Sequence, residues 1–231
     1  MEKSKITKWH HAYIQNAYQE LEQGYTKVQI DRLNINAKNS KVLDVGCGPG
    51  NMLTALSDDN PKLLIGVDTD KIFLQYAHDK NESILEHTTT HPNFIQGTLP
   101  TLPFQDETFD IVTCFLVMPH VPDDEIALTE LTRVLKSGGT LAISGHGIGF
   151  PIRYLKRFKF KPLKMYLASF IYLLTGKKLI KNTLQNPRQI CKILNQLGMK
   201  IKVQVNKRVF GCIATYWINA TKREVIPKAT Q

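Results

Sequence analysis

The chain has 231 residues, 42 % of them hydrophobic, and no internal repeat or low-complexity segment, so we expect one α/β domain with its own core. Residues 1–130 hold 10 basic and 19 acidic side chains, whereas residues 131–231 hold 20 basic and one acidic, for a net charge of +10. Four cysteines without a C-x-x-C pair argue against disulfides or metal sites and favour reduced thiols in a cytoplasmic protein. We expect no signal peptide, because the first residues, Met-Glu-Lys-Ser-Lys, contain no apolar run.

Hydrophobic periodicity predicts an amphipathic helix at about residues 8–33, followed by strands that alternate with helices. This alternation predicts an α/β fold with a Rossmann-like, mainly parallel seven-stranded sheet and helices on both faces. The last two strands are expected to form a hairpin across Asn206-Lys207-Arg208, which adds an antiparallel edge strand. The expected strands are 41–45, 63–67, 93–96, 110–115, 139–144, 199–205 and 210–218, and the expected helices lie near 51–57, 70–80, 123–135 and 187–197.

The first expected strand runs directly into a loop with glycine at every second position, ending at Gly50. Such a loop lets backbone N–H groups approach a ligand at the carboxyl end of a strand. A phosphate cradle would need a lysine directly after Gly50, but the next basic residue is Lys62. A dinucleotide fingerprint would need glycine where Asn51 stands.

Acidic residues surround this loop in the sequence. Asp68 follows the second strand, 18 residues after Gly50, where a carboxylate can accept hydrogen bonds from ribose hydroxyls. Asp44, Asp58 and Asp59 bracket the loop and no cation offsets them, which disfavours a pyrophosphate. A ligand with cationic sulfonium and ammonium groups fits better, and S-adenosylmethionine is such a ligand.

Four segments together resemble the class I S-adenosylmethionine-dependent methyltransferases, in particular the small-molecule group that includes the quinone-biosynthesis methyltransferases. The resemblance spans roughly residues 40–145 and implies a single methyltransferase domain over 1–231. It further implies an N-terminal helical cap at 1–40 and a basic and apolar helical insert at 145–186, after the fifth strand. The four segments are Val42–Gly50, Gly66-Val67-Asp68, Phe109–Val112 with the following loop to His120, and Leu131–Ser144.

The resemblance also assigns residues to the methyl donor. It implies that the glycine loop shapes the pocket for the methionine portion and that Asp68 holds the ribose. The adenine end is expected at the loop after the third strand, where many relatives have an aspartate and this chain has Thr98, a weaker acceptor. The cofactor-binding residues expected on this basis are Asp44, Gly46, Cys47, Gly48, Gly50, Asp68, Thr69, Thr98, Leu99 and Phe115.

Two histidines are candidates for a general base, which an oxygen acceptor needs and a neutral amine does not. His120 follows the fourth strand, where relatives often carry a histidine that faces the cleft, and imidazole suits proton transfer at neutral pH. The alternative is that His120 only caps the helix that starts near Asp123. His146 lies just past the fifth strand, at the same end of the sheet. No cluster of residues has metal-ligand spacing.

The insert after the fifth strand is expected to carry substrate-pocket structure. Its central apolar run of ten residues is too short to span a bilayer, which needs about 20. Three interpretations remain open: a lid over the cleft, a segment in a membrane interface with lysines on anionic headgroups, and a dimer contact. The insert contains interleaved cations and aromatics at Arg153–Lys161, the apolar run Met165–Leu174, and Lys177, Lys178 and Lys181.

We therefore expect an enzyme that transfers a methyl group from S-adenosylmethionine, by in-line displacement, to a small and largely apolar acceptor at oxygen or carbon. We expect it in the cytoplasm, with peripheral attachment to an anionic membrane surface as an open alternative. The basic half and its aromatic residues would also suit RNA, so an RNA methyltransferase is the alternative function. Because the apolar run lacks polar groups that read base edges, nucleic acid ranks below a small apolar substrate.

Overall fold

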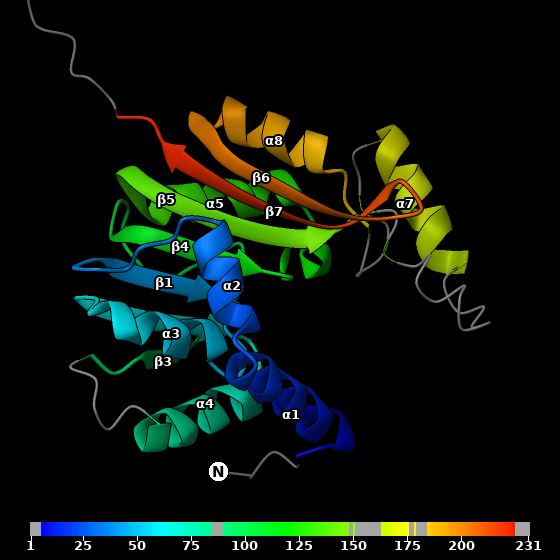
Figure 1. Ribbon diagram of the computed structural model, residues 1–231. Coiled ribbons are helices and arrows are strands. Elements are labelled where there is room, and N and C mark those ends of the chain that lie inside the picture. Colours follow the sequence, from blue (N-terminus) through cyan, green and yellow to red (C-terminus); the bar gives the residue numbers. More distant parts are fainter. Residues whose placement is uncertain are drawn as a thin grey trace, which may run out of the picture.

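The computed structural model describes residues 6–84, 90–147, 150, 163–175, 178 and 184–224. Seven strands form one sheet in the order β3-β2-β1-β4-β5-β7-β6 (Figure 1). Every pair is parallel except β5–β7 and β6–β7, so β7 alone runs against its neighbours, while β6 forms the edge. This confirms the predicted fold. The strands are β1 Lys41–Val45, β2 Leu63–Asp68, β3 Asn93–Gln96, β4 Phe109–Phe115, β5 Leu135–His146, β6 Met199–Val209 and β7 Cys212–Lys222.

Helices cover both faces of the sheet, as apolar side chains on both faces of parallel strands require (Figure 1). One face packs on α5 (Asp124–Val134) and α8 (Pro187–Gln196), whose buried leucines and isoleucines join the larger core cluster. The other face packs on α2 (Tyr25–Arg32) and α3 (Asn51–Leu56). Helix α4 (Lys71–Ile84) packs on β3 and β2, and α1 (Lys8–Glu22) packs on α4 through a smaller apolar cluster. The short 3₁₀ helices are η1 (Ser57–Asp59) and η2 (Met118–His120), and the insert contains α7 (Leu163–Thr175).

The structure corrects the N-terminal helix, which the sequence pattern extends without a break from about 8 to 33. The helix ends at Glu22, and a new one begins at Tyr25. Between them Gly24 has a φ of +73°, a left-handed conformation that glycine adopts without strain and that a continuous helix does not contain. The break turns α2 onto the sheet while α1 runs on toward α4.

The structure also corrects the turn of the last hairpin. Asn206 and Lys207 are inside strand β6, where they pair with Tyr216 and Thr215 of β7. The turn residues are Phe210 and Gly211, both with positive φ, as a tight turn with the twist of a hairpin requires. The glycine therefore marks the turn, whereas the polar Asn-Lys-Arg triplet extends the edge strand.

None of the helices in the described ranges is both long enough and apolar enough to cross a membrane. The apolar run of the insert forms α7, in agreement with a helical insert. The segment Arg153–Lys161, with its interleaved cations and aromatics, lies outside the described residues, as do Lys177 and Lys181.

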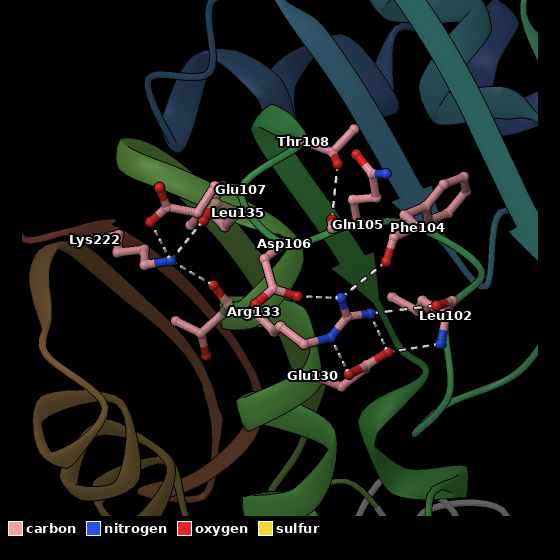
Figure 2. A network of polar contacts seen from close by, with 11 residues as sticks. Leu102, Phe104, Gln105, Asp106, Glu107, Thr108, Glu130, Arg133, Leu135 and Lys222 are labelled. Atoms are coloured by element: carbon pink, nitrogen blue, oxygen red, sulfur yellow. Dashed lines mark hydrogen bonds and ion pairs between the residues drawn. The ribbon is translucent and has the colours of Figure 1, made fainter.

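A polar network joins the loop after β3 to helix α5 (Figure 2). The Arg133 guanidinium donates to both carboxylate oxygens of Glu130 at 2.8 Å, to the Phe104 carbonyl at 2.8 Å and to Asp106 at 2.7 Å. Glu130 also accepts the backbone N–H of Leu102 at 2.6 Å, and its hydrogen bond from Arg133 is the main reason its pKa lies below the usual range. A planar, bidentate donor therefore fixes the course of this loop.

Lys222 closes the same region from the far end of β7 (Figure 2). Its ammonium donates to the carbonyls of Thr132 and Leu135 at the end of α5, at 3.0 and 2.7 Å, and lies 3.0 Å from the Glu107 carboxylate. A cation is favourable there because the last carbonyls of a helix have no partner within the helix.

Replacing Arg133 by lysine should lower the free energy of unfolding by about 1–3 kcal/mol, because a single ammonium cannot serve Glu130 and two loop carbonyls together. Urea unfolding followed by circular dichroism measures the change. Arg188→Lys, at an exposed position on α8, is the matched control and should shift stability by less than about 0.5 kcal/mol. Equal stability of Arg133→Lys and wild type would contradict this account of the network.

Candidate functional site

The order of the strands creates a crevice at the carboxyl end of β1. Strands β2 and β3 follow on one side of β1, and β4 and β5 on the other, so the connections leave in opposite directions. Ligands of open α/β sheets bind at such a switch point. The glycine loop that follows β1 lies there, since the N–H groups of Gly46 and Cys47 both donate to the Val67 carbonyl of β2, at 2.7 and 3.1 Å.

Gly46 shows why this loop needs glycine. Its φ is +74°, and a Cβ added to it would lie 2.0 Å from a methyl carbon of Val117. A side chain would therefore clash with the loop after β4 as well as strain the backbone. The close approach of the loops after β1 and β4 depends on this one residue.

Asp68, the last residue of β2, points back at the glycine loop. One carboxylate oxygen accepts the N–H of Gly48 at 2.8 Å, and the other accepts the N–H of Asp70 at 2.9 Å. Asp70 in turn accepts the N–H groups of Ile72 and Phe73 at the start of α4. A direct hydrogen bond therefore joins the glycine loop to the carboxylate at the end of the second strand.

Asp44 lies beneath the loop with 4 % of its surface exposed. Its pKa is raised to about 7, mainly by burial; a hydrogen bond from the Thr113 hydroxyl at 2.6 Å opposes this shift, and the charge of Asp68 adds to it. Near pH 7 this carboxyl is therefore only partly ionised, and a cation bound beside it would lower its pKa.

The other two acidic residues near the loop in sequence do not bracket it in space. Asp58 and Asp59 belong to η1, at the far end of α3. Asp59 accepts the N–H of Ala37, which precedes β1, at 3.1 Å, and lies 4.0 Å from the ammonium of Lys27. Because α3 runs back along the sheet, it carries these carboxylates to the opposite end, and only Asp44 and Asp68 remain near the loop.

Helix α1 covers the glycine loop from outside. The Tyr18 hydroxyl donates to the Pro49 carbonyl at 3.1 Å, and the Asn51 side chain donates to the Ala17 carbonyl. Asn51 stands where a dinucleotide fingerprint would have its third glycine, and its contact with α1 shows what that side chain does here. Tyr13 lies against Gly48, and its pKa is raised by burial and by the charges of nearby acidic residues.

A cavity of about 390 Å³ opens between α1, α2, the glycine loop, the ends of β4 and β5, and the β6–β7 hairpin. Its walls combine apolar and polar side chains, with Glu20 and Asp44 as carboxyl groups and Lys207 as a cation. The lining residues are Tyr13, Ala17, Glu20, Thr26, Gln29, Asp44, Gly46, Cys47, Pro49, Asn51, Met52, Phe115, Leu116, Ser144, His146, Lys207, Thr215 and Trp217.

The expected site residues divide into two groups. Asp44, Gly46, Cys47, Phe115 and His146 line the cavity. The others are not among the lining residues: Gly48 and Gly50 belong to the loop, Asp68 and Thr69 lie at the end of β2, and Thr98 and Leu99 follow β3.

The two candidate histidines differ in position. His146 lines the cavity at the end of β5, and its ring stacks on Phe150 at a centroid distance of 3.6 Å. His120, the last residue of η2, has an exposed side chain and is not among the lining residues.

Sequence reasoning missed the walls that come from distant segments. Glu20 belongs to α1, and Lys207, Thr215 and Trp217 belong to the hairpin. The side chains of Thr215 and Trp217 share one face because they are two residues apart on β7. The sequence alternation places Thr215 and Trp217 on one face, but it does not tell which strand of the hairpin lies beside β5.

Residues 43–143 match a family model described as a methyltransferase domain. A demethylmenaquinone methyltransferase of Bacillus licheniformis is 33 % identical over 147 residues, which cover 63 % of this chain and 59 % of that protein. An uncharacterized methyltransferase of Schizosaccharomyces pombe is 38 % identical over 106 residues, 44 % of this chain and 38 % of that protein. The chain thus spans less than two thirds of the length of these relatives.

Solved structures with the same fold are more distant in sequence. A protein of Methanosarcina mazei, described as a methyltransferase dependent on S-adenosylmethionine (SAM), has a TM-score of 0.66 at 21 % identity; the match covers 83 % of this chain and 96 % of that chain. Magnesium protoporphyrin IX methyltransferase of Synechocystis, solved with bound SAH, has a TM-score of 0.64 at 18 % identity and covers 95 % of this chain and 90 % of its own. At these identities the likeness establishes the fold, and it agrees with the fold that the sequence predicts.

Asp44→Asn should stabilise the protein more at pH 8 than at pH 5. The folded pKa of Asp44, about 7, lies above the value of 3.8 for a free side chain, so its stabilising protonated form is lost as the pH rises through 7. Asparagine cannot ionise, so the variant should gain on the order of 2 kcal/mol relative to wild type between these pH values.

Urea unfolding at both pH values measures this gain. Asp58→Asn replaces an exposed carboxylate at the far end of the sheet and is the matched control, for which we expect no such pH-dependent difference. A constant difference between Asp44→Asn and wild type across this range would show that Asp44 is ionised in the folded protein at both values.

Proposed function

We propose that this chain, which carries a class I S-adenosylmethionine-dependent methyltransferase domain, transfers a methyl group to a small and largely apolar acceptor, at oxygen or carbon. The observation that carries the proposal is the Asp68 carboxylate, held 2.8 Å from the N–H of Gly48 beside the cavity. An acidic residue at the end of β2 next to a glycine loop fits a ribose with two hydroxyls and a ligand whose other end is cationic.

The charges around the loop fit the donor. S-adenosylmethionine supplies a methyl group on a cationic sulfonium, together with an ammonium and a carboxylate. Glu20 and Asp44 line the cavity, Asp68 is bonded to the glycine loop, and a cationic group beside Asp44 would favour its ionised form.

The chain's own residues would mainly hold and orient the reactants. Asp68 would accept hydrogen bonds from the ribose hydroxyls, and the loop at Thr98 would border the adenine. Tyr13 and the rest of α1 would close the outer side and exclude water, since α1 is tied to the loop through Tyr18 and Asn51. Such positioning and exclusion of water supply much of the rate enhancement when the leaving group is a neutral thioether.

The cavity supports an apolar acceptor with a polar reacting group. Met52, Phe115, Leu116 and Trp217 provide apolar surface, and Ser144 and Thr215, on the strands next to Phe115 and Trp217, provide hydroxyls. The demethylmenaquinone methyltransferases among the relatives are named for a quinone, which is a largely apolar ring system. An acceptor of that general chemistry is our proposal for this chain.

We infer that His146 is the general base that takes the proton from the acceptor. It lines the cavity, whereas His120 is exposed on η2. A base must lie within hydrogen-bond reach of the proton that it removes, so the histidine that lines the cavity is the better candidate.

Asp68→Asn should weaken binding of S-adenosylmethionine by about 100-fold or more, because two hydrogen bonds to a charged acceptor are lost or weakened. Isothermal titration calorimetry measures the dissociation constant. Asp79→Asn, at an exposed position on α4, is the matched control and should bind as wild type does. An unchanged affinity of Asp68→Asn would remove the central assignment.

His146→Gln should lower the rate of methyl transfer by about 10²–10⁴-fold and leave the affinity for S-adenosylmethionine unchanged. Tritium transfer from labelled cofactor to an organic-solvent extract of cell lipids measures the rate, with His78→Gln, exposed on α4, as control. Loss of transfer in His120→Gln, with His146→Gln active, would assign the base to His120 instead. Transfer to total RNA, falling steeply with salt, in place of the lipid extract would support the RNA alternative.

A further inference from the structure

Helix α7 carries a ridge of exposed large apolar side chains, which we call the α7 ridge. Leu167, Phe170 and Leu174 are 62 %, 59 % and 71 % exposed. They are spaced three and four residues apart, so they follow one another along the same face of the helix. Isolated exposed apolar side chains are common, but three in register on one face indicate a surface that something covers.

The opposite face of α7 is fixed to the protein. Ala168, Ser169 and Tyr172 are buried, and the Ser169 hydroxyl accepts the N–H of Leu184 at 3.1 Å. The ridge therefore points outward because the other side of the helix is committed to the domain.

A buried ionic network holds this arrangement. The Tyr172 hydroxyl donates to the Asp124 carboxylate at the start of α5, and the Lys178 ammonium lies 2.5 Å from the same carboxylate. Lys178 also donates to the carbonyls of Met118 and Val121, at 2.8 and 3.1 Å, and Gln185 donates to Asp124 at 2.7 Å. Since turning α7 would break the hydrogen bond from Tyr172 to a charged acceptor and expose its buried ring, α7 has little freedom to turn its ridge inward.

The positive charge of residues 131–231 indicates what kind of surface covers the α7 ridge. Residues 131–231 hold 20 basic residues and a single acidic one, and the sequence places Lys159, Lys161 and Lys164 just before the ridge. A second copy would have to bring the same basic half against itself, because a two-fold contact uses the same patch on both subunits. An anionic lipid surface accepts both the apolar side chains and the positive charge.

We propose that α7 lies flat in the interface of an anionic membrane, with the α7 ridge among the acyl chains and basic side chains of residues 131–231 at the headgroups. The helix has 13 residues and is about 20 Å long, which is too short to cross a hydrocarbon core of about 30 Å. Figure 1 shows α7 at the end of the sheet where the β6–β7 turn carries the exposed Phe210. This contact is separate from methyl transfer, and it would bring an apolar acceptor dissolved in the bilayer close to the enzyme.

Sedimentation with vesicles tests the proposal on the full chain. Wild type should sediment with equimolar phosphatidylglycerol–phosphatidylcholine vesicles at least tenfold more strongly than with pure phosphatidylcholine, and raising the salt from about 0.05 M to about 0.5 M should release much of it. The triple substitution Leu167→Gln, Phe170→Gln, Leu174→Gln should lower the partition coefficient at least tenfold. Because the three side chains are exposed, the variant should keep the thermal unfolding midpoint of wild type.

Val28→Gln is the matched control, because Val28 is an exposed apolar residue on α2, 49 % accessible and far from the insert in sequence. It should bind vesicles as wild type does. The proposal is overturned if wild type stays in the supernatant with both kinds of vesicle, or if the triple variant sediments as wild type does. It is also overturned if wild type is a dimer by light scattering and the triple variant a monomer, since the ridge would then join two copies of this chain.

Discussion

The hydrogen bond between Asp68 and the N–H of Gly48 connects the parts of the candidate site to the sheet. It exists because β1 and β2 are parallel and in register, with Val45 beside Val67, so both strands end at the same edge. The glycine loop can approach β2 and the loop after β4 only because Gly46 has no side chain. One carboxylate, one glycine and one strand register together define where a ligand can sit, and helix α1 and the hairpin then determine its surroundings.

The two halves of the chain carry opposite net charge, acidic in residues 1–130 and basic in residues 131–231. The first half supplies the carboxyl groups at the crevice, and Asp44 among them is buried deeply enough for its pKa to rise to about 7. The second half supplies the cavity wall at Lys207, the buried Lys178 that anchors the insert, and Lys222 at the end of α5. A donor with cationic groups would meet the carboxyl groups of the first half, and an anionic surface would meet the cations of the second half.

Local patterns in the sequence predicted the part of the site that lies on consecutive segments. The loop from Gly46 to Gly50, the carboxylate of Asp68 and the buried Asp44 are where the strand–loop–helix pattern puts them. The errors concern segments whose partners are distant: Asp59 pairs near Ala37 instead of near the loop, and the hairpin turns at Gly211 instead of at Asn206. For Asp59 the helix itself was predicted correctly and only its direction along the sheet was missed, whereas for the hairpin the end of the strand was misplaced.

The sequence by itself determined the fold class, the glycine loop and the carboxylate that faces it, because hydrophobic period, turn chemistry and the common edge of parallel strands act over short stretches of chain. Only the tertiary structure decided that His146 lines the cavity and His120 does not, that Trp217 and Lys207 form its far wall, and that α7 turns its apolar ridge outward. These outcomes depend on which distant segments pack together. That packing is set by summed contacts such as the Asp124–Lys178 pair, which join residues far apart in sequence and leave no local periodic signal.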